Sequence, residues 1–121
     1  MRRAVSRFEN AIVVDRSSIA RRLLANHLRD YCESVLAVST VDELREQLGV
    51  HVSLVVIDST AEGAIDWLEE SSRQPQRPAV LVVTHLPSRS EETYATLLGA
   101  IGYLAKPVAS NELARALAPS L

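Results

Sequence analysis

The stretch LVVIDST, residues 54–60, places an aspartate directly after four consecutive apolar residues. A short continuous run of leucine and β-branched side chains is typical of a strand that is buried on both faces of a sheet. A carboxylate at the end of such a run is costly unless charges or hydrogen bonds compensate it. Asp58 therefore marks both a central strand and a candidate functional residue.

Similar apolar runs recur along the chain, and segments with apolar residues at helical spacing separate them. The runs are residues 11–14, 35–38, 54–57, 79–83 and 101–105. Each reads as a strand buried on both faces. The alternation predicts an α/β fold, a doubly wound (βα)5 parallel five-stranded sheet with helices on both faces. We expect one domain over residues 9–121 and a flexible basic tail over residues 1–8.

Polar residues and glycines mark where the predicted helices begin and end. A Ser or Thr followed three residues later by Glu predicts a capping box, and a glycine after an apolar stripe predicts a helix stop. The predicted boxes are Thr40–Glu43 and Ser88–Glu91, the predicted cap of the last helix is Ser110, and the predicted stops are Gly49 and Gly99.

The composition excludes several classes of protein. The chain has 121 residues, of which 47% are hydrophobic and 23% charged, which suits one globular domain. No apolar run approaches the roughly 20 residues of a membrane helix, and the first residues do not resemble a signal peptide. The single cysteine, Cys32, excludes an internal disulfide and is expected to be buried near the end of the first helix. A chain with one cysteine fits a reducing compartment, so we expect a cytoplasmic protein. Without a long apolar run, we expect no membrane partner.

The basic residues are unevenly distributed and consist of twelve arginines and one lysine, Lys106. Residues 1–29 carry seven arginines and two acids, a net charge of +5, whereas residues 30–121 carry a net charge of −7. An arginine-rich first helix is able to attract a polyanion or a nucleotide. No aromatic residues interleave these arginines to stack bases, so a solvated helix face is the preferred interpretation and nucleic acid is not an expected partner.

Polar and charged residues follow four of the predicted strands. They are Asp15-Arg16, Asp58, Thr84-His85 and Lys106-Pro107. Ligands of parallel α/β sheets bind at the carboxyl ends of the strands, so these side chains are expected to share one edge. The two carboxylates suit a hard cation such as Mg2+, and the hydroxyl and ammonium suit a phosphoryl group.

The order VVDRSSIARRLL (13–24), LVVIDST (54–60), VLVVTH (80–85) and GYLAKP (102–107) resembles the receiver domain of bacterial two-component response regulators. The resemblance covers roughly residues 9–118 and implies a flavodoxin-like fold. It implies that Asp58 is the phosphoacceptor, that Asp15, Asp58 and the Thr60 carbonyl bind Mg2+, and that Thr84, Tyr103 and Lys106 are the switch hydroxyl, the switch aromatic and the phosphate-contacting lysine. It also implies a cis peptide before Pro107. The only lysine of the chain thus falls where this family uses lysine.

Three departures from the family pattern affect the predicted site. Arg16 replaces an acid, and it either pairs with Asp58 in place of the metal or turns its long stem to solvent. The segment after Asp58 lacks the usual Met-Pro and is short, which makes Thr60 the weakest of the predicted metal ligands. His85 replaces a small residue, and it either narrows the entrance or is a surface histidine without a role.

Two function classes follow. The first is a phosphorylatable receiver that takes a phosphoryl group from a sensor histidine kinase or a phosphotransfer protein, with Mg2+ bound weakly. The second is a degenerate receiver, an interaction module that works without phosphorylation. We do not expect an enzyme, because the sequence has no Gly-rich phosphate loop and no nucleophile–base pair. The resemblance implies that an output domain, a partner protein or a second copy binds through about residues 88–117.

Overall fold

The computed structural model describes residues 8–48 and 51–121. One sheet holds five parallel strands in the order β2-β1-β3-β4-β5. The strands are β1 (Phe8–Val14), β2 (Cys32–Val38), β3 (Leu54–Asp58), β4 (Ala79–Thr84) and β5 (Gly102–Ala105). Each lies where an apolar run predicts it, so the (βα)5 flavodoxin-like fold class is confirmed.

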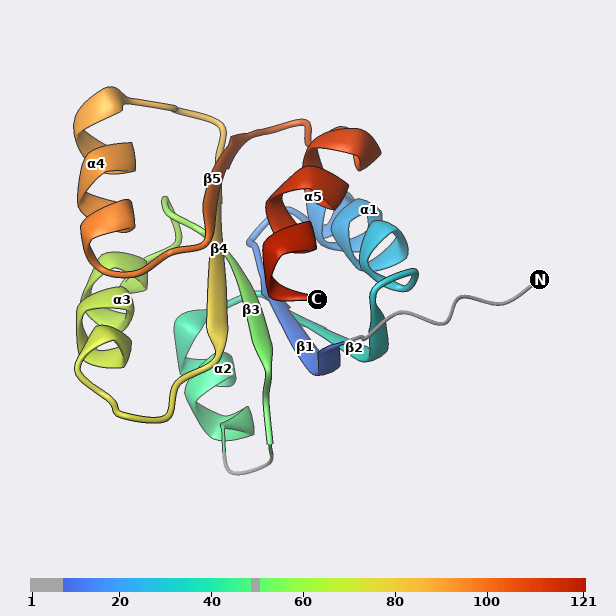
Figure 1. The fold of residues 1–121 in the computed structure, drawn as a ribbon, viewed down its shortest axis with the longest axis horizontal. Coiled ribbons are helices and arrows are strands. Elements are labelled where there is room, and N and C mark those ends of the chain that lie inside the picture. Colours follow the sequence, from blue (N-terminus) through green and yellow to red (C-terminus); the bar gives the residue numbers. More distant parts are fainter. Residues whose placement is uncertain (1–7, 49–50) are drawn as a thin grey trace.

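The helices alternate with the strands and cover both faces of the sheet. They are α1 (Ser18–Leu28), α2 (Val41–Gln47), α3 (Ala64–Ser72), α4 (Arg89–Leu97) and α5 (Ser110–Leu117), with a short 3-10 turn at Ala118–Ser120. Figure 1 shows α1 and α5 on one face and α2, α3 and α4 on the other. None of the helices in the described part of the chain has the length and apolarity needed to cross a membrane.

Two apolar cores result, one on each face of the sheet. Successive residues of a strand point to opposite faces, so Ile12 and Val14 join the core under α2, α3 and α4, while Val13 joins the core under α1 and α5. Trp67 anchors the first core and Leu113 the second, and both are buried. The two cores hold the central strands rigidly and thereby fix the positions of the strand ends.

The outer strands differ from the prediction. β2 and β5 lie at the edges of the sheet, and both are only partly buried, with Leu36 of β2 43% exposed. Cys32 is buried as predicted, and as the first residue of β2 it lies four residues after the end of α1. β1 begins at Phe8, which is buried, one residue before the predicted domain start. Residues 1–7 of the predicted tail and Gly49 lie outside the described residues.

The helix ends agree with the sequence in part. Thr40 and Glu43 form the complete predicted capping box, and Gly99, with φ +94°, follows α4 as predicted. The prediction for the last helix is wrong. Ser110 is its first residue and Ala109 its N-cap, whose N–H donates to Glu112 Oε1 at 3.0 Å.

Candidate functional site

Four of the predicted site residues lie at the carboxyl edge of the sheet, because parallel strands all end on the same side. Asp15 follows β1, Asp58 ends β3, Thr84 ends β4, and Lys106 follows β5. The first three are buried. The Lys106 ammonium joins the two acids, with Nζ 2.8 Å from Asp15 Oδ2 and 2.9 Å from Asp58 Oδ2. The structure thus brings together both carboxylates and the only lysine.

The remaining carboxylate oxygens are also occupied. Asp15 Oδ1 accepts the backbone N–H of Ser17 at 2.9 Å, just before α1 begins. Asp58 Oδ1 accepts both the backbone N–H and the hydroxyl of Thr60, each at 2.9 Å. All four carboxylate oxygens therefore accept hydrogen bonds from the protein itself. This compensates for the cost of burying two negative charges.

The charge arrangement sets the protonation of the site. Burial alone would raise the pKa of Asp58, but hydrogen bonds from Thr60 and Lys106 outweigh it and hold this pKa below its usual range. Burial alone would lower the pKa of Lys106, but the hydrogen bonds to Asp15 and Asp58 and their charges raise it. At neutral pH Asp58 is therefore ionised and Lys106 is protonated.

The ends of β4 and β5 are tied together next to this cluster. The backbone N–H of Lys106 donates to the Thr84 carbonyl at 2.8 Å. The Thr84 hydroxyl oxygen accepts the backbone N–H of Leu86 at 3.0 Å, which leaves its own hydrogen free to be donated. The peptide between Lys106 and Pro107 is cis, as the resemblance implies.

Two arginines near the site behave differently. Arg16 is exposed, and its guanidinium has no hydrogen bond or ion pair with any described residue, so it does not pair with Asp58. Of the two predicted positions of Arg16, the structure has the one in solvent. Arg21 was not predicted as a site residue, yet its Nη1 donates to the carbonyls of Asp15 and Arg16, at 2.8 and 3.2 Å. Its position one turn into α1 behind Asp15 is the sequence signal for this role.

His85 is exposed and lies beside Lys106. Both residues line a hollow of about 430 Å³ between the start of α1 and the segment after β5. The hollow is mostly apolar, and Ile19 and Leu23 of α1 form part of its wall. His85 thus borders an opening next to Lys106 and is exposed, which fits either of its two predicted roles.

Tyr103 belongs to a hydrogen-bond network that the sequence did not reveal. Its hydroxyl donates to Glu91 Oε1 at 2.7 Å and accepts the Ser88 N–H at 3.1 Å. Ser59, the buried neighbour of Asp58, donates its hydroxyl to the same Glu91 oxygen at 2.8 Å. The predicted Ser88–Glu91 box is therefore half formed: Ser88 Oγ accepts the Glu91 N–H, while the Glu91 carboxylate turns to Ser59 and Tyr103.

The donor set available for a metal is small. Within residues 8–48 and 51–121 no group of three or more His, Cys, Asp or Glu side chains is placed to hold a metal ion. Asp15 and Asp58 supply two carboxylates. Mg2+ is commonly held by one or two carboxylates together with water and phosphate oxygens. The two carboxylates therefore fit part of the donor set of a Mg2+ ion.

Comparison with known proteins identifies the fold. No protein-family model and no curated protein matches the sequence. A chemotaxis response regulator of Vibrio cholerae superposes with a TM-score of 0.78 at 20% identity, covering 97% of this chain and 100% of the other.

Two further solved structures are also similar. A Burkholderia pseudomallei response regulator, described with a phosphorylated aspartic acid, a calcium ion and citrate, has a TM-score of 0.76 at 24% identity, covering 90% of this chain and 66% of its own. An atypical orphan response regulator, described as having a phosphorylation-independent regulatory mechanism, has a TM-score of 0.77 at 20% identity, covering 90% of this chain and 92% of its own. The chain therefore has the fold of the response regulator receiver domains.

Proposed function

We propose that the chain is a signalling receiver domain in which Asp58 accepts a phosphoryl group. The proposal rests above all on the meeting of Asp15, Asp58, Thr84 and Lys106 at one edge of a receiver fold. In this proposal a sensor histidine kinase or a phosphotransfer protein is the donor. The single Cys32 suits the cytoplasm as the place where these partners meet.

The residues have complementary roles in the proposed transfer. An Asp58 carboxylate oxygen attacks the phosphorus of a phosphohistidine, an O–P bond forms, the N–P bond breaks, and the imidazole leaves with the electron pair. Lys106 already contacts Asp58 Oδ2, so its ammonium is placed to follow the phosphoryl oxygens. Thr84 retains a hydroxyl hydrogen that it is able to donate to the same group.

Mg2+ is the cofactor that the donor set fits. Asp15, Asp58 and the Thr60 carbonyl would hold it, and a bound ion would neutralise charge on the phosphoryl oxygens. Because Arg16 takes the place of a further acid, the set has two carboxylates. We infer weak binding in the absence of a phosphoryl donor.

A second candidate function is an interaction module that works without phosphorylation. One observation favours it: every Asp15 and Asp58 carboxylate oxygen already accepts a hydrogen bond, and Lys106 supplies the cation between them. The site is thus electrostatically satisfied without metal or phosphate. The structural similarity to an atypical orphan regulator is compatible with this alternative.

A titration with beryllofluoride and Mg2+, followed by amide NMR signals, separates the two candidates. Saturable shifts of the Asp58, Thr84 and Lys106 signals support phosphorylation. If these signals do not move in the native protein, phosphorylation at Asp58 is the wrong proposal and the module remains. The variant Arg16→Asp then locates the cause, because restored shifts would assign the loss to the missing third carboxylate. Arg22→Asp, an exposed position of α1, is the matched charge control.

The output face in this proposal comprises α4, β5 and α5, residues 88–117. Leu97 is 78% exposed and Tyr94 40% exposed on α4, and Tyr103 connects α4 to β5. We expect Tyr103→Ala to weaken binding of a partner or of a second copy without unfolding the domain. Sedimentation velocity with and without beryllofluoride measures self-association, and binding that is unchanged in Tyr103→Ala would count against this face.

A further inference from the structure

The Glu91 carboxylate on α4 binds side chains from two other elements of the fold. Its Oε1 accepts the hydroxyl hydrogen of Ser59, which follows β3, at 2.8 Å, and that of Tyr103, on β5, at 2.7 Å. Ser59 is 7% exposed, so its hydroxyl has little access to water, and Glu91 and Tyr103 are partly buried. These three side chains form what we call the Glu91 bridge.

The bridge is connected to the phosphoacceptor of the proposed function through Ser59. Ser59 directly follows Asp58, and Thr60 on its other side donates two hydrogen bonds to Asp58 Oδ1, each at 2.9 Å. Ser59 therefore lies within a turn whose acceptor is the Asp58 carboxylate. Within the described residues no hydrogen bond joins Thr84, the predicted switch hydroxyl, to Tyr103. The hydrogen-bonded route from the site to Tyr103 thus runs through Ser59 and Glu91.

Phosphorylation changes the acceptor of this turn. In an acyl phosphate one Asp58 oxygen is bonded to phosphorus, and the negative charge resides on the phosphoryl oxygens. Thr60 would then donate to an uncharged carboxyl oxygen, and hydrogen bonds to a charged acceptor are roughly twice as strong as those between neutral groups. The turn that positions Ser59 is therefore expected to loosen when Asp58 is phosphorylated.

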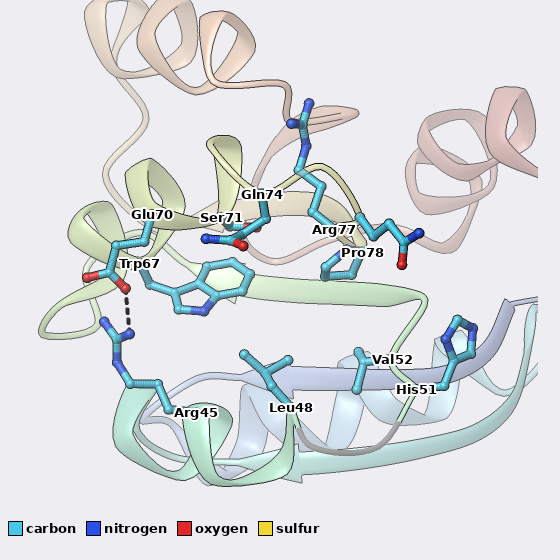
Figure 2. A pocket seen from close by; sticks show the side chains of 11 residues that line it. Arg45, Leu48, His51, Val52, Trp67, Glu70, Ser71, Gln74, Arg77 and Pro78 are labelled. Carbon is cyan, nitrogen blue, oxygen red and sulfur yellow. Dashed lines mark hydrogen bonds and ion pairs between the residues drawn. The ribbon is translucent and has the colours of Figure 1, made fainter.

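The other end of α4 is held independently, through α3. The Tyr94 hydroxyl donates to the Glu69 carboxylate of α3. The next residue of α3, Glu70, pairs with Arg45 of α2, with Oε1 2.5 Å from Nη1. Figure 2 shows this ion pair beside a hollow that the ends of α2 and α3 border. Loss of the Glu91 bridge should therefore free the first turn of α4 and leave the turn that carries Tyr94 in place.

We propose that the Glu91 bridge couples the Asp58 site to the output face. Without a phosphoryl group, the Ser59 hydroxyl holds the Glu91 carboxylate, and with it the first turn of α4 and the Tyr103 ring. Loss of the Asp58 charge on phosphorylation weakens this hold and releases both. Ser59 and Glu91 are positioning residues, and the inference rests on the proposed phosphorylation of Asp58.

The resting bridge is tested without a phosphoryl mimic. NMR spectra of 13C-labelled tyrosine report on the Tyr103 ring in Ser59→Ala, in Glu91→Ala and in the double variant, and Glu92→Ala removes an exposed acid from the same turn as a matched control. Both single variants should shift the ring signals and the control should not. The double variant should match Glu91→Ala, because the Ser59 hydroxyl has nothing to hold once the carboxylate is gone.

Two results overturn the bridge: a Tyr103 signal that is unchanged in Ser59→Ala, and a double variant that shifts further than Glu91→Ala. Should Ser59→Ala fail to fold, Glu91→Gln takes its place, since it keeps the shape of the side chain and removes its charge. An unchanged Tyr103 signal in Glu91→Gln then overturns the bridge equally.

The release step is tested with beryllofluoride and Mg2+. In the native protein the Tyr103 ring and the amides of residues 89–92 should shift with the same concentration dependence as the Asp58 amide, and the amides of residues 95–97 should shift less. In Ser59→Ala the Asp58 shift should persist and the Tyr103 shift should largely be lost. A Tyr103 shift of native size in Ser59→Ala overturns the coupling alone. If the Asp58 amide of the native protein does not respond, the phosphoacceptor proposal fails together with the release step, and the resting spectra still decide whether Ser59 holds Glu91.

Discussion

Lys106 contacts two buried carboxylates, those of Asp15 and Asp58. Asp15 and Asp58 are 1% and 4% exposed, so neither is stabilised by bulk water. Removing one partner of a buried charge cluster leaves the others uncompensated, a larger cost than the net value of the intact cluster. This asymmetry makes Lys106 important for stability as well as for the proposed transfer.

We predict that Lys106→Met lowers the free energy of unfolding at pH 7 by about 3 kcal/mol. Urea denaturation measures the change. The double variant Lys106→Met with Asp58→Asn should recover part of it, because one of the two stranded charges is gone. Mg2+ should stabilise Lys106→Met more than the native protein, since the cation position is open. A loss of less than about 1 kcal/mol, typical of surface ion pairs, would show that the cluster is well solvated.

The same cluster determines the dependence of stability on pH. The pKa of Asp58 is lowered in the folded protein, so its contribution exists above about pH 4 and is lost as the pH falls further. The pKa of Lys106 is raised, so its contribution exists below about pH 10 and is lost as the pH rises further. We predict a plateau in the unfolding free energy between these limits. In Asp58→Asn the acid side should decline less steeply, and an unchanged acid slope would contradict the assignment.

At the scale of the elements, Glu91 joins three parts of the fold. One oxygen of its carboxylate accepts hydrogen bonds from Ser59, after β3, and from Tyr103, on β5, while Glu91 itself lies in the first turn of α4. Burial and the Glu91 carboxylate raise the pKa of Tyr103, whereas the Ser88 N–H lowers it. A single side chain therefore connects the residue next to Asp58 with α4 and with Tyr103.

We predict that Glu91→Ala lowers the pKa of Tyr103 and lets its ring sample a second orientation. Titration of 13C-labelled tyrosine by NMR measures both effects. Glu92→Ala removes an exposed carboxylate from the same turn of α4 and serves as the control. Equal effects of the two variants would mean that general charge, and not the Glu91 bridge, acts on Tyr103.

β5 and α5 pack closely at Gly102, which has no side chain. A Cβ at Gly102 would lie 2.8 Å from Leu81 Cδ1 and 3.2 Å from Ala116 Cβ. We predict that Gly102→Ala destabilises the domain by about 1–3 kcal/mol through overpacking. Adding Ala116→Gly should relieve part of this strain, and a double-mutant cycle of unfolding free energies measures the coupling. Additive effects would show that the helix does not approach as closely as described.

At the scale of the whole molecule, much of the fold could be predicted because the buried strands are continuous apolar runs. The site could be predicted from the strand ends alone, since parallel strands bring Asp58 and Lys106 to one edge. The direction of Arg16 and the partners of Glu91 could not be predicted. Which neighbours a long side chain contacts depends on the folded arrangement of the chain. The hollow that Trp67 and Pro78 line could not be predicted either, because no periodicity describes how the loop before β4 packs.

The strand order also predicts how protection against hydrogen exchange is distributed. β1, β3 and β4 are paired on both sides, whereas β2 and β5 are each paired on one side. We predict slowest amide exchange in β1, β3 and β4 and faster exchange at the outward-facing amides of β2 and β5. Native-state exchange followed by NMR measures this, and protection in β5 equal to that in β3 would contradict it.

The Lys106 bridge has a consequence for biosynthesis. Lys106 donates one hydrogen bond to Asp15, which is 91 positions away in the chain, and one to Asp58, which is 48 positions away. A chain leaving the ribosome exposes Asp15 and Asp58 long before the lysine that compensates them has been made. Until β5 joins the edge of the sheet, both acids need water or a cation from solution. Completion of the site is thus a late event, and a nascent chain stalled before residue 106 would hold two unshielded carboxylates.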